Sequence, residues 1–366
     1  MATSAVAIIF AQKKGILYMA VSVFAQSLLQ WHSESNSRIL PWKEEKDPYK
    51  IWLSEIILQQ TRAEQGLPYY VKFISKYPTV FDLAAAPEGE VFKLWQGLGY
   101  YARCRNLLFT ARAIVAQWQG VFPQTYTELL TLKGVGEYTA AAIASFAYDL
   151  PHPVIDGNVY RVLSRYFAEP TPINTPEGKK VFTALANKVF DAQHPAAYNQ
   201  AIMDLGAVVC KPKQALCNLC YLSDHCKAFN TDQVDQYPLK LQKIKVKERF
   251  FSYYVFLHKD QVYIQQRTHK DVWQDLYEFW LSEGPAPAAL SSLLADEQFV
   301  LEYRQNIFHY KQRLTHQLIR SDFSLVRLKR IPALLKGPGI WINKSEIHDY
   351  SFPKTIVSFL EEIPYF

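Results

Sequence analysis

The chain has 366 residues, of which 49% are apolar and 14% aromatic. Such a composition supports a sizeable core and excludes a disordered chain, and at ~100–200 residues for each domain the length suggests about two domains. The net charge of +6 and the pI near 8.8 fit a nucleic-acid partner without requiring one. No apolar run approaches the ~20 residues that a membrane-spanning helix needs.

The first twenty residues do not resemble a secretory signal. A short apolar stretch, Ala5–Phe10, comes before Lys13 and Lys14, whereas a signal carries its positive charges first. We expect residues 1–20 to be a disordered extension or the result of an upstream start codon, with Met19 as a plausible true beginning. We expect the protein to be cytoplasmic.

A helix is predicted from Asp47, a good N-cap, through Pro48 at the first helical position and on to Thr61. Its apolar residues occupy nearly every face, which predicts a buried helix. Glu55 is the exception. A carboxylate in such a helix is paired with a partner, borders a cleft or has a raised pKa, and a structural glutamate bonded to backbone would also account for it.

Two glycine-containing segments follow. The run Gly97–Arg103 is flexible, aromatic and basic, which suits a wedge that enters a duplex, although a plain turn between helices would look the same. Gly134-Val135-Gly136 then precedes an alanine-rich helix. A Gly-x-Gly turn at a helix start presents free backbone N–H groups and can hold a phosphate, and a simple helix start is the alternative.

Asp156 lies twenty residues after Gly136 and is followed by a glycine, so it can approach whatever the turn holds. Two carboxylates in a cleft can break an N-glycosidic bond: a protonated one donates to the leaving base, and an ionised one stabilises positive charge on the sugar. Glu55 suits the first role and Asp156 the second. A capping aspartate without chemistry is the alternative.

Four of the five cysteines fall within seventeen residues: Cys210, Cys217, Cys220 and Cys226. In a cytoplasmic chain this spacing indicates a metal site rather than disulfides. One Cys-x-x-Cys pair with longer arms favours an iron–sulfur cluster over zinc, although zinc and coincidence stay open.

The composition changes after Phe229. Residues 230–249 carry several lysines and are predicted to be a basic linker that could lie along DNA or be a solvated connector. Strand-like runs follow at 251–257, 261–264 and 314–319, with helices expected at 289–294 and 356–360. These elements predict a small α/β domain.

Together these motifs resemble the adenine DNA glycosylase family (MutY type) within the helix-hairpin-helix glycosylase superfamily. The resemblance covers most of residues 24–229 and rests on these runs: Leu40-Pro41-Trp42, Ser54–Thr61, Gly97–Tyr101, the hairpin, Asp156-Gly157-Asn158, Asn199-Gln200-Ala201, Asp204–Ala207 and the cysteine quartet. It implies a helical glycosylase core with a [4Fe–4S] cluster loop, joined to an α/β Nudix-like domain. The implied reaction is removal of adenine mispaired with 8-oxoguanine or guanine.

The resemblance also implies roles for individual residues. Glu55 protonates adenine, and Asp156 stabilises the cation or intermediate with help from Tyr138 and Asn158. Gln200 helps to form the adenine pocket. The residues implied to contact DNA are Gln60, Thr61, Leu98, Gly99, Tyr100, Gly134 and Gly136, and among them Gln60, Leu98 and Tyr100 enter the duplex. The four cysteines hold the cluster, which supports DNA binding without a redox step in base removal.

Tyr138 separates this interpretation from a related one. Endonuclease III-like enzymes carry at this position a lysine that attacks the sugar as a Schiff-base nucleophile, and a phenol cannot form that imine. We therefore expect a monofunctional glycosylase. An endonuclease III-like glycosylase with lyase activity, a non-catalytic damage-binding protein and a redox sensor that uses the cluster are the alternatives.

In the C-terminal domain, no Arg-Glu-x-x-Glu-Glu-like run follows Glu278-Phe279-Trp280, so metal-dependent pyrophosphate hydrolysis is not expected. The family reads 8-oxoguanine with a Phe-Ser-His loop, and Leu314-Thr315-His316 stands in its place here. Thr315 and His316 are therefore implied to contact the lesion. The expected domains are 21–229, with the cluster loop at 210–226, and 250–366, and the expected partner is double-stranded DNA bound by a monomer.

Overall fold

The computed structural model describes residues 23–241 and 246–363. The expected extension at 1–20 and the proposed start at Met19 lie outside the described residues. The chain divides into two compact units, one formed by residues 1–62 and 113–242 and the other by residues 63–112 and 243–366. No helix in the described part of the chain is long and apolar enough to span a membrane.

The first unit is helical. Residues 23–34 form a helix, and the elements that follow are α2 (Pro48–Leu58), α7 (Tyr126–Leu129), α8 (Glu137–Tyr148), α9 (Gly157–Phe167), α10 (Pro176–Val189), α11 (Pro195–Val208), η1 (Cys217–Leu219), η2 (Ser223–His225), α12 (Lys227–Asn230) and η3 (Val234–Gln236).

The predicted start of α2 is confirmed. The carboxylate of Asp47 accepts a hydrogen bond of 2.9 Å from the backbone N–H of Tyr49, and Pro48 occupies the first turn. The helix ends at Leu58, three residues before the predicted end, and Gln60 has a φ of 56°. The apolar faces of α2 are buried as expected.

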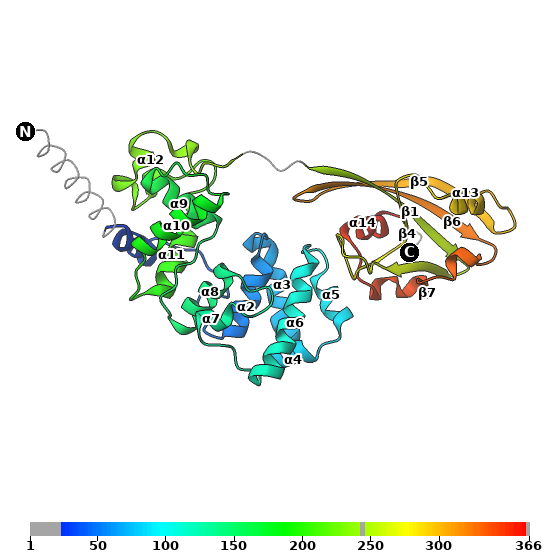
Figure 1. Cartoon of the computed structure of the whole chain (residues 1–366), viewed down its shortest axis with the longest axis horizontal. Coiled ribbons are helices and arrows are strands. Elements are labelled where there is room, and N and C mark those ends of the chain that lie inside the picture. Colours follow the sequence, from blue (N-terminus) through cyan, green and yellow to red (C-terminus); the bar gives the residue numbers. More distant parts are fainter. Residues whose placement is uncertain (1–22, 242–245, 364–366) are drawn as a thin grey trace, which may run out of the picture. The chain divides into compact units, whose positions relative to one another are not determined.

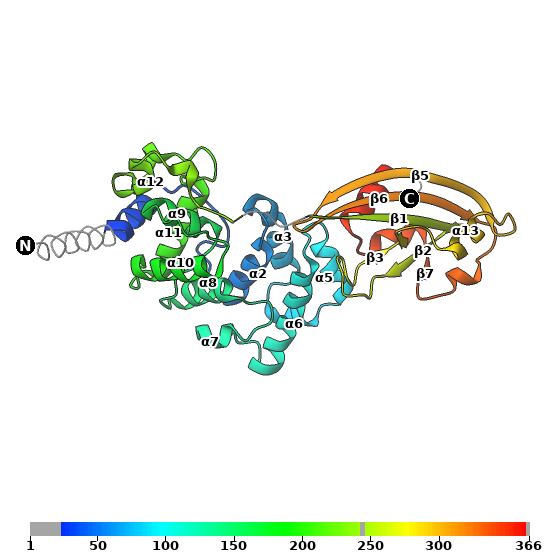
Figure 2. The ribbon, with the colours of Figure 1, turned by 45° about the horizontal axis from the view of Figure 1, so that its top comes forward.

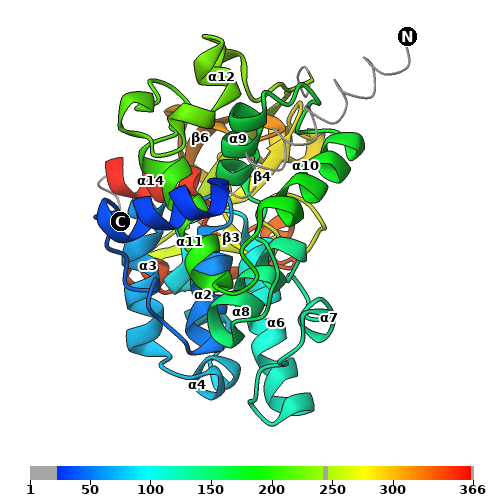
Figure 3. The same ribbon diagram turned by 90° about the vertical axis from the view of Figure 1, so that its left-hand side faces the viewer.

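The core of the first unit lies between helices that are distant in sequence. α2 packs against α8, and α9 packs against α11, as Figures 1 and 3 show. One continuous apolar cluster includes Phe24, Val162, Phe182 and Ile202, and Cys210, Cys220 and Cys226 lie against it. The segment that carries the cysteines is therefore fixed to the same core as α9.

The second unit contains helices and a sheet. Its elements are α3 (Ala63–Lys76), α4 (Val80–Ala85), α5 (Glu88–Trp95), α6 (Tyr101–Trp118, which continues past the unit boundary), β1 (Lys247–His258), β2 (Gln261–Gln266), β3 (Tyr277–Glu278), β4 (Trp280–Glu283), α13 (Ala288–Leu294), β5 (Val300–Arg313), β6 (Gln317–Leu328), η4 (Ala333–Leu335), β7 (Ile340–Asn343), η5 (Lys344–Asp349) and α14 (Lys354–Glu362).

The strands form one mixed sheet in the order β3-β2-β1-β6-β5, with β4 paired to β1 and β7 to β2. The long strands β1, β6 and β5 lie side by side in Figure 2. β1 and β6 run parallel from Lys247 opposite Gln317 to Leu257 opposite Arg327, and β5 and β6 are antiparallel.

Both faces of this sheet carry apolar side chains, and a helix packs against each face. On one face Tyr254, Phe256, Val326 and Leu328 pack with residues of α13. On the other, Phe323 stacks on Phe359 of α14 with ring centroids 4.6 Å apart. Successive side chains in a strand point to opposite faces, and because residues of both sets are buried here, the sheet is buried on both sides. The predicted α/β domain is confirmed, and so are helices α13 and α14.

One predicted strand is partly wrong. The runs at 251–257 and 261–264 lie within β1 and β2, but the run at 314–319 forms strand only from Gln317 onwards. Leu314, Thr315 and His316 form the turn between β5 and β6. Because Arg313 pairs with Leu318 in antiparallel register, the chain has to reverse between them. The residues around Leu314 include no glycine or proline that would have predicted this turn from the sequence.

Candidate active site

Glu55 is the buried carboxylate of α2, with 5% of its surface exposed. Burial raises its pKa from 4.5 to about 7; a hydrogen bond from the Tyr138 hydroxyl lowers the pKa, and the nearby charge of Asp156 raises it. An ordinary glutamate is ionised at neutral pH. A substantial fraction of Glu55 is therefore protonated near pH 7 and can donate its proton.

Asp156 is the N-cap of α9. One carboxylate oxygen accepts backbone hydrogen bonds from Asn158 at 2.9 Å and Val159 at 2.8 Å, and the other accepts from the Asn158 side-chain amide at 2.7 Å. Burial raises the pKa of Asp156 above its ordinary value, and the three N–H donors and the charge of Arg161 counteract only part of this rise. The donors and the start of α9 favour the ionised form.

Tyr138 contacts Glu55 and is influenced by the charge of Asp156. It lies in the first turn of α8, its hydroxyl bonds to Glu55, and the same hydroxyl lies 4.0 Å from the sulfur of Met203 on α11. Burial, with the charges of Glu55 and Asp156, holds the pKa of this phenol well above 10, so the hydroxyl stays protonated and acts as a donor. The structure thus brings Glu55, Tyr138, Asp156 and Asn158 together from three helices.

Arg161 is a residue of this site that the sequence did not reveal. It lies one turn after Asn158 and is 8% exposed. Its guanidinium donates to the Asn158 side-chain oxygen at 2.8 Å, to the Gly206 carbonyl at 2.6 Å and to the Cys210 carbonyl at 2.7 Å. It therefore connects the turn at Asp156 to the cysteine loop. In the sequence, the position of this arginine three residues after Asn158, in a helix with apolar faces, was the one feature that could have indicated its role.

Gly206 allows α11 to approach this turn. A Cβ added at Gly206 would lie 2.5 Å from the Cβ of Asn158, which is closer than two carbon atoms can come without movement. Asn199, also on α11, accepts from the Val154 N–H at 3.0 Å and donates to the His152 carbonyl at 2.9 Å. It fixes the segment that leads into Asp156. Its neighbour Gln200 is half-buried on the same helix.

The hairpin turn at Gly134–Gly136 is exposed at both glycines, while Val135 between them is buried. Gly134 has a φ of 83°, a conformation that favours glycine, and Gly136 is the N-cap of α8 with no side-chain cap. The first N–H groups of α8 are thus presented at an exposed turn. This geometry matches a site for an anion such as phosphate.

The other DNA-contact candidates differ in exposure. Gln60 is exposed and Thr61 half-buried, just after α2. In the second unit, Tyr100 is 47% exposed, whereas Leu98 is only 5% exposed. Tyr100 donates to or accepts from the hydroxyl of Thr315 at 2.6 Å, and Thr315 and His316 are both exposed. Gly99 is half-buried and has a φ of 73°.

The four cysteines lie in one compact loop around η1 and η2. Successive backbone turns connect Cys217, Cys220 and Cys226, with the Cys220 N–H donating to the Cys217 carbonyl at 3.1 Å. Arg165 of α9, which is 2% exposed, donates to the Cys210 sulfur at 3.4 Å. Burial, with a smaller contribution from the other three cysteines, raises the pKa of the Cys220 thiol to about 12.

This donor set fits a charged metal cluster. Burial raises the pKa of the thiols of Cys217, Cys220 and Cys226, and bound metal would supply the positive charge that favours their thiolates. Within residues 23–241 and 246–363, no three His, Cys, Asp or Glu side chains converge closely enough for one metal ion. A cubane of four irons takes one thiolate on each iron, so its ligands stand farther apart than the ligands of a single ion.

Comparisons with known proteins agree with this geometry. Residues 53–188 match the model of the HhH-GPD superfamily of base excision DNA repair proteins, and residues 252–362 match the NUDIX domain. An adenine DNA glycosylase of Buchnera aphidicola from Schizaphis graminum is 31% identical over 354 residues, which cover 94% of this chain and 99% of that protein. The human adenine DNA glycosylase is 40% identical over 225 residues, covering 59% of this chain and 41% of that protein.

Among solved structures, a thermostable thymine-DNA glycosylase aligns with a TM-score of 0.54 and 29% identity, covering 58% of this chain and 98% of that one. That match supports the helical glycosylase fold of the larger part of the chain. The helical core, the Nudix-like domain and a relative that is similar over almost its entire length together show that this chain belongs to the adenine DNA glycosylase family.

Proposed function

We propose that this protein removes adenine mispaired with 8-oxoguanine or guanine in double-stranded DNA, as a monofunctional base-excision enzyme acting as a monomer. The observation that carries the proposal is the buried Glu55, whose pKa is raised to about 7 and whose carboxyl group contacts Tyr138 beside Asp156. A carboxyl that keeps its proton near neutral pH can protonate a poorly basic leaving group. Family membership supplies adenine as that leaving group.

In the proposed mechanism, the target adenine leaves the base stack, and Glu55 transfers its proton to N7 of the purine. The bond between N9 and C1′ of the sugar then breaks, and its electron pair leaves with the base. Asp156 stabilises the positive charge that develops on the sugar. Water adds to C1′ and releases a proton, which leaves an abasic site.

In this scheme Tyr138 and Asn158 do not react with the substrate, and each orients one of the two carboxylates. The Tyr138 hydroxyl orients Glu55, and the Asn158 amide orients Asp156 at 2.7 Å. Without an amine at position 138 the chain has no Schiff-base nucleophile there, which supports monofunctional excision. Gln200 on α11 is proposed to contribute to the adenine pocket.

For binding of the duplex, we propose that the exposed N–H groups at Gly134 and Gly136 hold a phosphate. Gln60, Thr61, Gly99 and Tyr100 are proposed to contact the DNA. Leu98 is proposed to enter the duplex as well, and because it is 5% exposed in this structure its side chain has to move outward to do so.

The cysteines Cys210, Cys217, Cys220 and Cys226 are proposed to hold a [4Fe–4S] cluster. When bound, the cluster supplies positive charge and fixes the loop. Arg161 and Arg165 tie that loop to α9, so the loop supports the turn that presents Asp156. We propose no electron transfer in base removal.

The C-terminal domain is proposed to read the base opposite adenine. Thr315 and His316 are exposed in the turn between β5 and β6, where they can approach a base. We propose the division into a glycosylase domain at 21–229, a basic linker at 230–249 and this reading domain at 250–366. The family matches at 53–188 and 252–362 support it.

The decisive experiment is single-turnover excision by cluster-loaded protein on a labelled duplex with adenine opposite 8-oxoguanine, resolved with and without alkali. Strand breaks only after alkali are expected. Breaks without alkali would establish lyase chemistry of the endonuclease III kind, and binding without excision would establish a damage-binding protein. The same assay on Glu55→Gln, which has no proton to transfer, should show a strong loss of excision. Glu177→Gln, which makes the same chemical change at an exposed glutamate of α10, is its control.

A further inference from the structure

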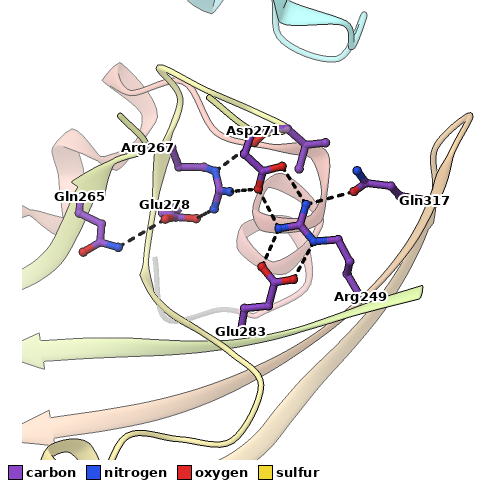
Figure 4. Close-up of polar contacts among 8 residues, drawn as sticks. Arg249, Gln265, Arg267, Asp271, Glu278, Glu283 and Gln317 are labelled. Carbon is purple, nitrogen blue, oxygen red and sulfur yellow. Dashed lines mark hydrogen bonds and ion pairs between the residues drawn. The ribbon is translucent and has the colours of Figure 1, made fainter. Parts of the chain in front are cut away.

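The C-terminal sheet contains a polar network around two arginines, drawn in Figure 4. Its first strand, β1, begins at Lys247 and so includes the last residues of the proposed linker. We call this polar network the Arg249 network, and it consists of Arg249, Arg267, Asp271, Glu278 and Glu283, with Gln265 and Gln317 at its ends. These residues come from β1, β2, the loop after β2, β3, β4 and β6. Little of the Arg249 side chain is solvent-exposed, at 10%.

Arg249 uses all five of its N–H groups. Two carboxylates bind in bidentate fashion, Asp271 at 2.9 and 2.7 Å and Glu283 at 2.8 and 2.6 Å. The fifth N–H donates to the side-chain oxygen of Gln317 at 3.1 Å. The guanidinium also lies 4.8 Å from the ring centroid of Phe251. A lysine has three donors without this planar geometry and could not reproduce the set.

Gln317 connects this network to the turn between β5 and β6. It is the first residue of β6 and directly follows His316. Backbone bonds also hold the turn: the Leu314 N–H donates to the Gln317 carbonyl at 2.8 Å, and the Lys247 N–H donates to the His316 carbonyl at 3.0 Å. These two bonds fix the backbone of the turn. The bond from Arg249 adds a side-chain anchor at its C-terminal end.

The network also holds a second loop beside this turn. Asp271 accepts from both Arg249 and Arg267, and Arg267 in turn donates to the Val272 carbonyl at 3.1 Å and pairs with the buried Glu278. Residues 271–274 and residues 312–317 line one hollow of about 670 Å³ within the second unit. One arginine therefore contacts both of these walls.

We propose that Arg249 is a positioning residue for recognition of the base opposite adenine. By holding Gln317 and Asp271 it keeps Thr315 and His316 in the arrangement that distinguishes an oxidised purine from guanine. The inference rests on the proposed function, because it assigns a selectivity role to residues that do not touch the base themselves. We expect Arg249 to affect selectivity and not proton transfer from Glu55.

The test compares single-turnover excision of adenine opposite 8-oxoguanine and opposite guanine, using full-length cluster-loaded protein. Gln317→Met removes the side-chain oxygen that accepts from Arg249 and leaves both carboxylate pairs of Arg249 in place. Gln317→Glu keeps an acceptor oxygen at this position. Arg249→Lys keeps the charge but loses the five-donor geometry. Arg327→Gln is the matched control, because it removes an ion-paired arginine at the opposite end of β6, where the Arg327 Nε lies 2.9 Å from Glu302.

For Gln317→Met we expect the ratio of the two rates to fall about tenfold, the loss that corresponds to about 1.4 kcal/mol, with the melting temperature close to that of the wild type. Arg249→Lys should lower the ratio at least as far, Gln317→Glu should retain most of it, and Arg327→Gln should leave it unchanged.

An unchanged ratio in Gln317→Met, or an equal loss of both rates, would overturn the inference while leaving adenine excision established. If Arg249→Lys fails to fold, the pair of Gln317 variants still decides the matter. A wild-type protein that does not excise adenine at all would instead contradict the proposed function.

Discussion

Replacing Glu55 by glutamine is expected to slow excision strongly and to stabilise the fold at alkaline pH. Glutamine keeps the size and polarity of the side chain but has no proton to transfer. The loss of a positioned general acid typically costs about 10²–10⁴ in rate. In the wild type, excision should decline by about tenfold for each pH unit above 7, as Glu55 loses its proton.

The gain in stability follows from the same pKa. The folded protein holds the Glu55 proton more tightly than the unfolded chain does, so ionised Glu55 destabilises the fold. This cost is absent below about pH 4.5, where both states are protonated, and reaches its full value above about pH 7. A pKa that rises from 4.5 to about 7, at about 1.36 kcal/mol for each tenfold change in proton affinity, corresponds to about 3 kcal/mol.

Denaturant unfolding of the wild type and Glu55→Gln at pH 5 and pH 8 measures this difference, with single-turnover excision as the parallel assay. The variant should be about 3 kcal/mol more stable at pH 8, and the difference should shrink toward pH 5. Glu177→Gln should change neither quantity. If the two proteins have the same free energy of unfolding at both pH values, or if the variant excises adenine at the wild-type rate, Glu55 is not the desolvated acid described above.

Three further predictions concern the residues around the carboxylates. Tyr138→Phe removes a hydrogen bond that lowers the pKa of Glu55, so the alkaline limb of the pH–rate profile should move to higher pH; an unmoved limb would contradict the contact. Gly206→Ala forces a Cβ within 2.5 Å of the Asn158 Cβ and should cost about 1–3 kcal/mol of unfolding free energy together with excision rate, measured by denaturant titration and single-turnover assay. Arg161→Met removes the donor of three acceptors, of which the Gly206 carbonyl is buried, and should cost at least about 1–3 kcal/mol of unfolding free energy; a melting temperature equal to that of the wild type would show that the links to Asn158 and Cys210 are not needed.

Some parts of this protein follow from short stretches of sequence. Asp47 and Pro48 predicted the start of α2, because capping and the fixed φ of proline act within one turn. The Gly-x-Gly turn before α8, the cysteine spacing and the alternating strands of the C-terminal domain are likewise local patterns. Glu55 was identifiable as a candidate because a carboxylate among apolar residues requires an explanation.

Other features arise only when distant segments pack together. The contact of Glu55 with Tyr138 joins α2 to α8, and Arg161 meets Gly206 and Cys210 across long sequence separations. The burial of Leu98, the turn at Leu314–His316 and the five hydrogen bonds of Arg249 to three residues depend in the same way on tertiary neighbours. Residue types determined which chemistry the chain could carry, because the proton affinity and donor geometry belong to the side chains themselves. Tertiary packing determined which of those side chains meet and how far burial shifts their pKa values, because desolvation and hydrogen bonding depend on neighbours that the local sequence does not specify.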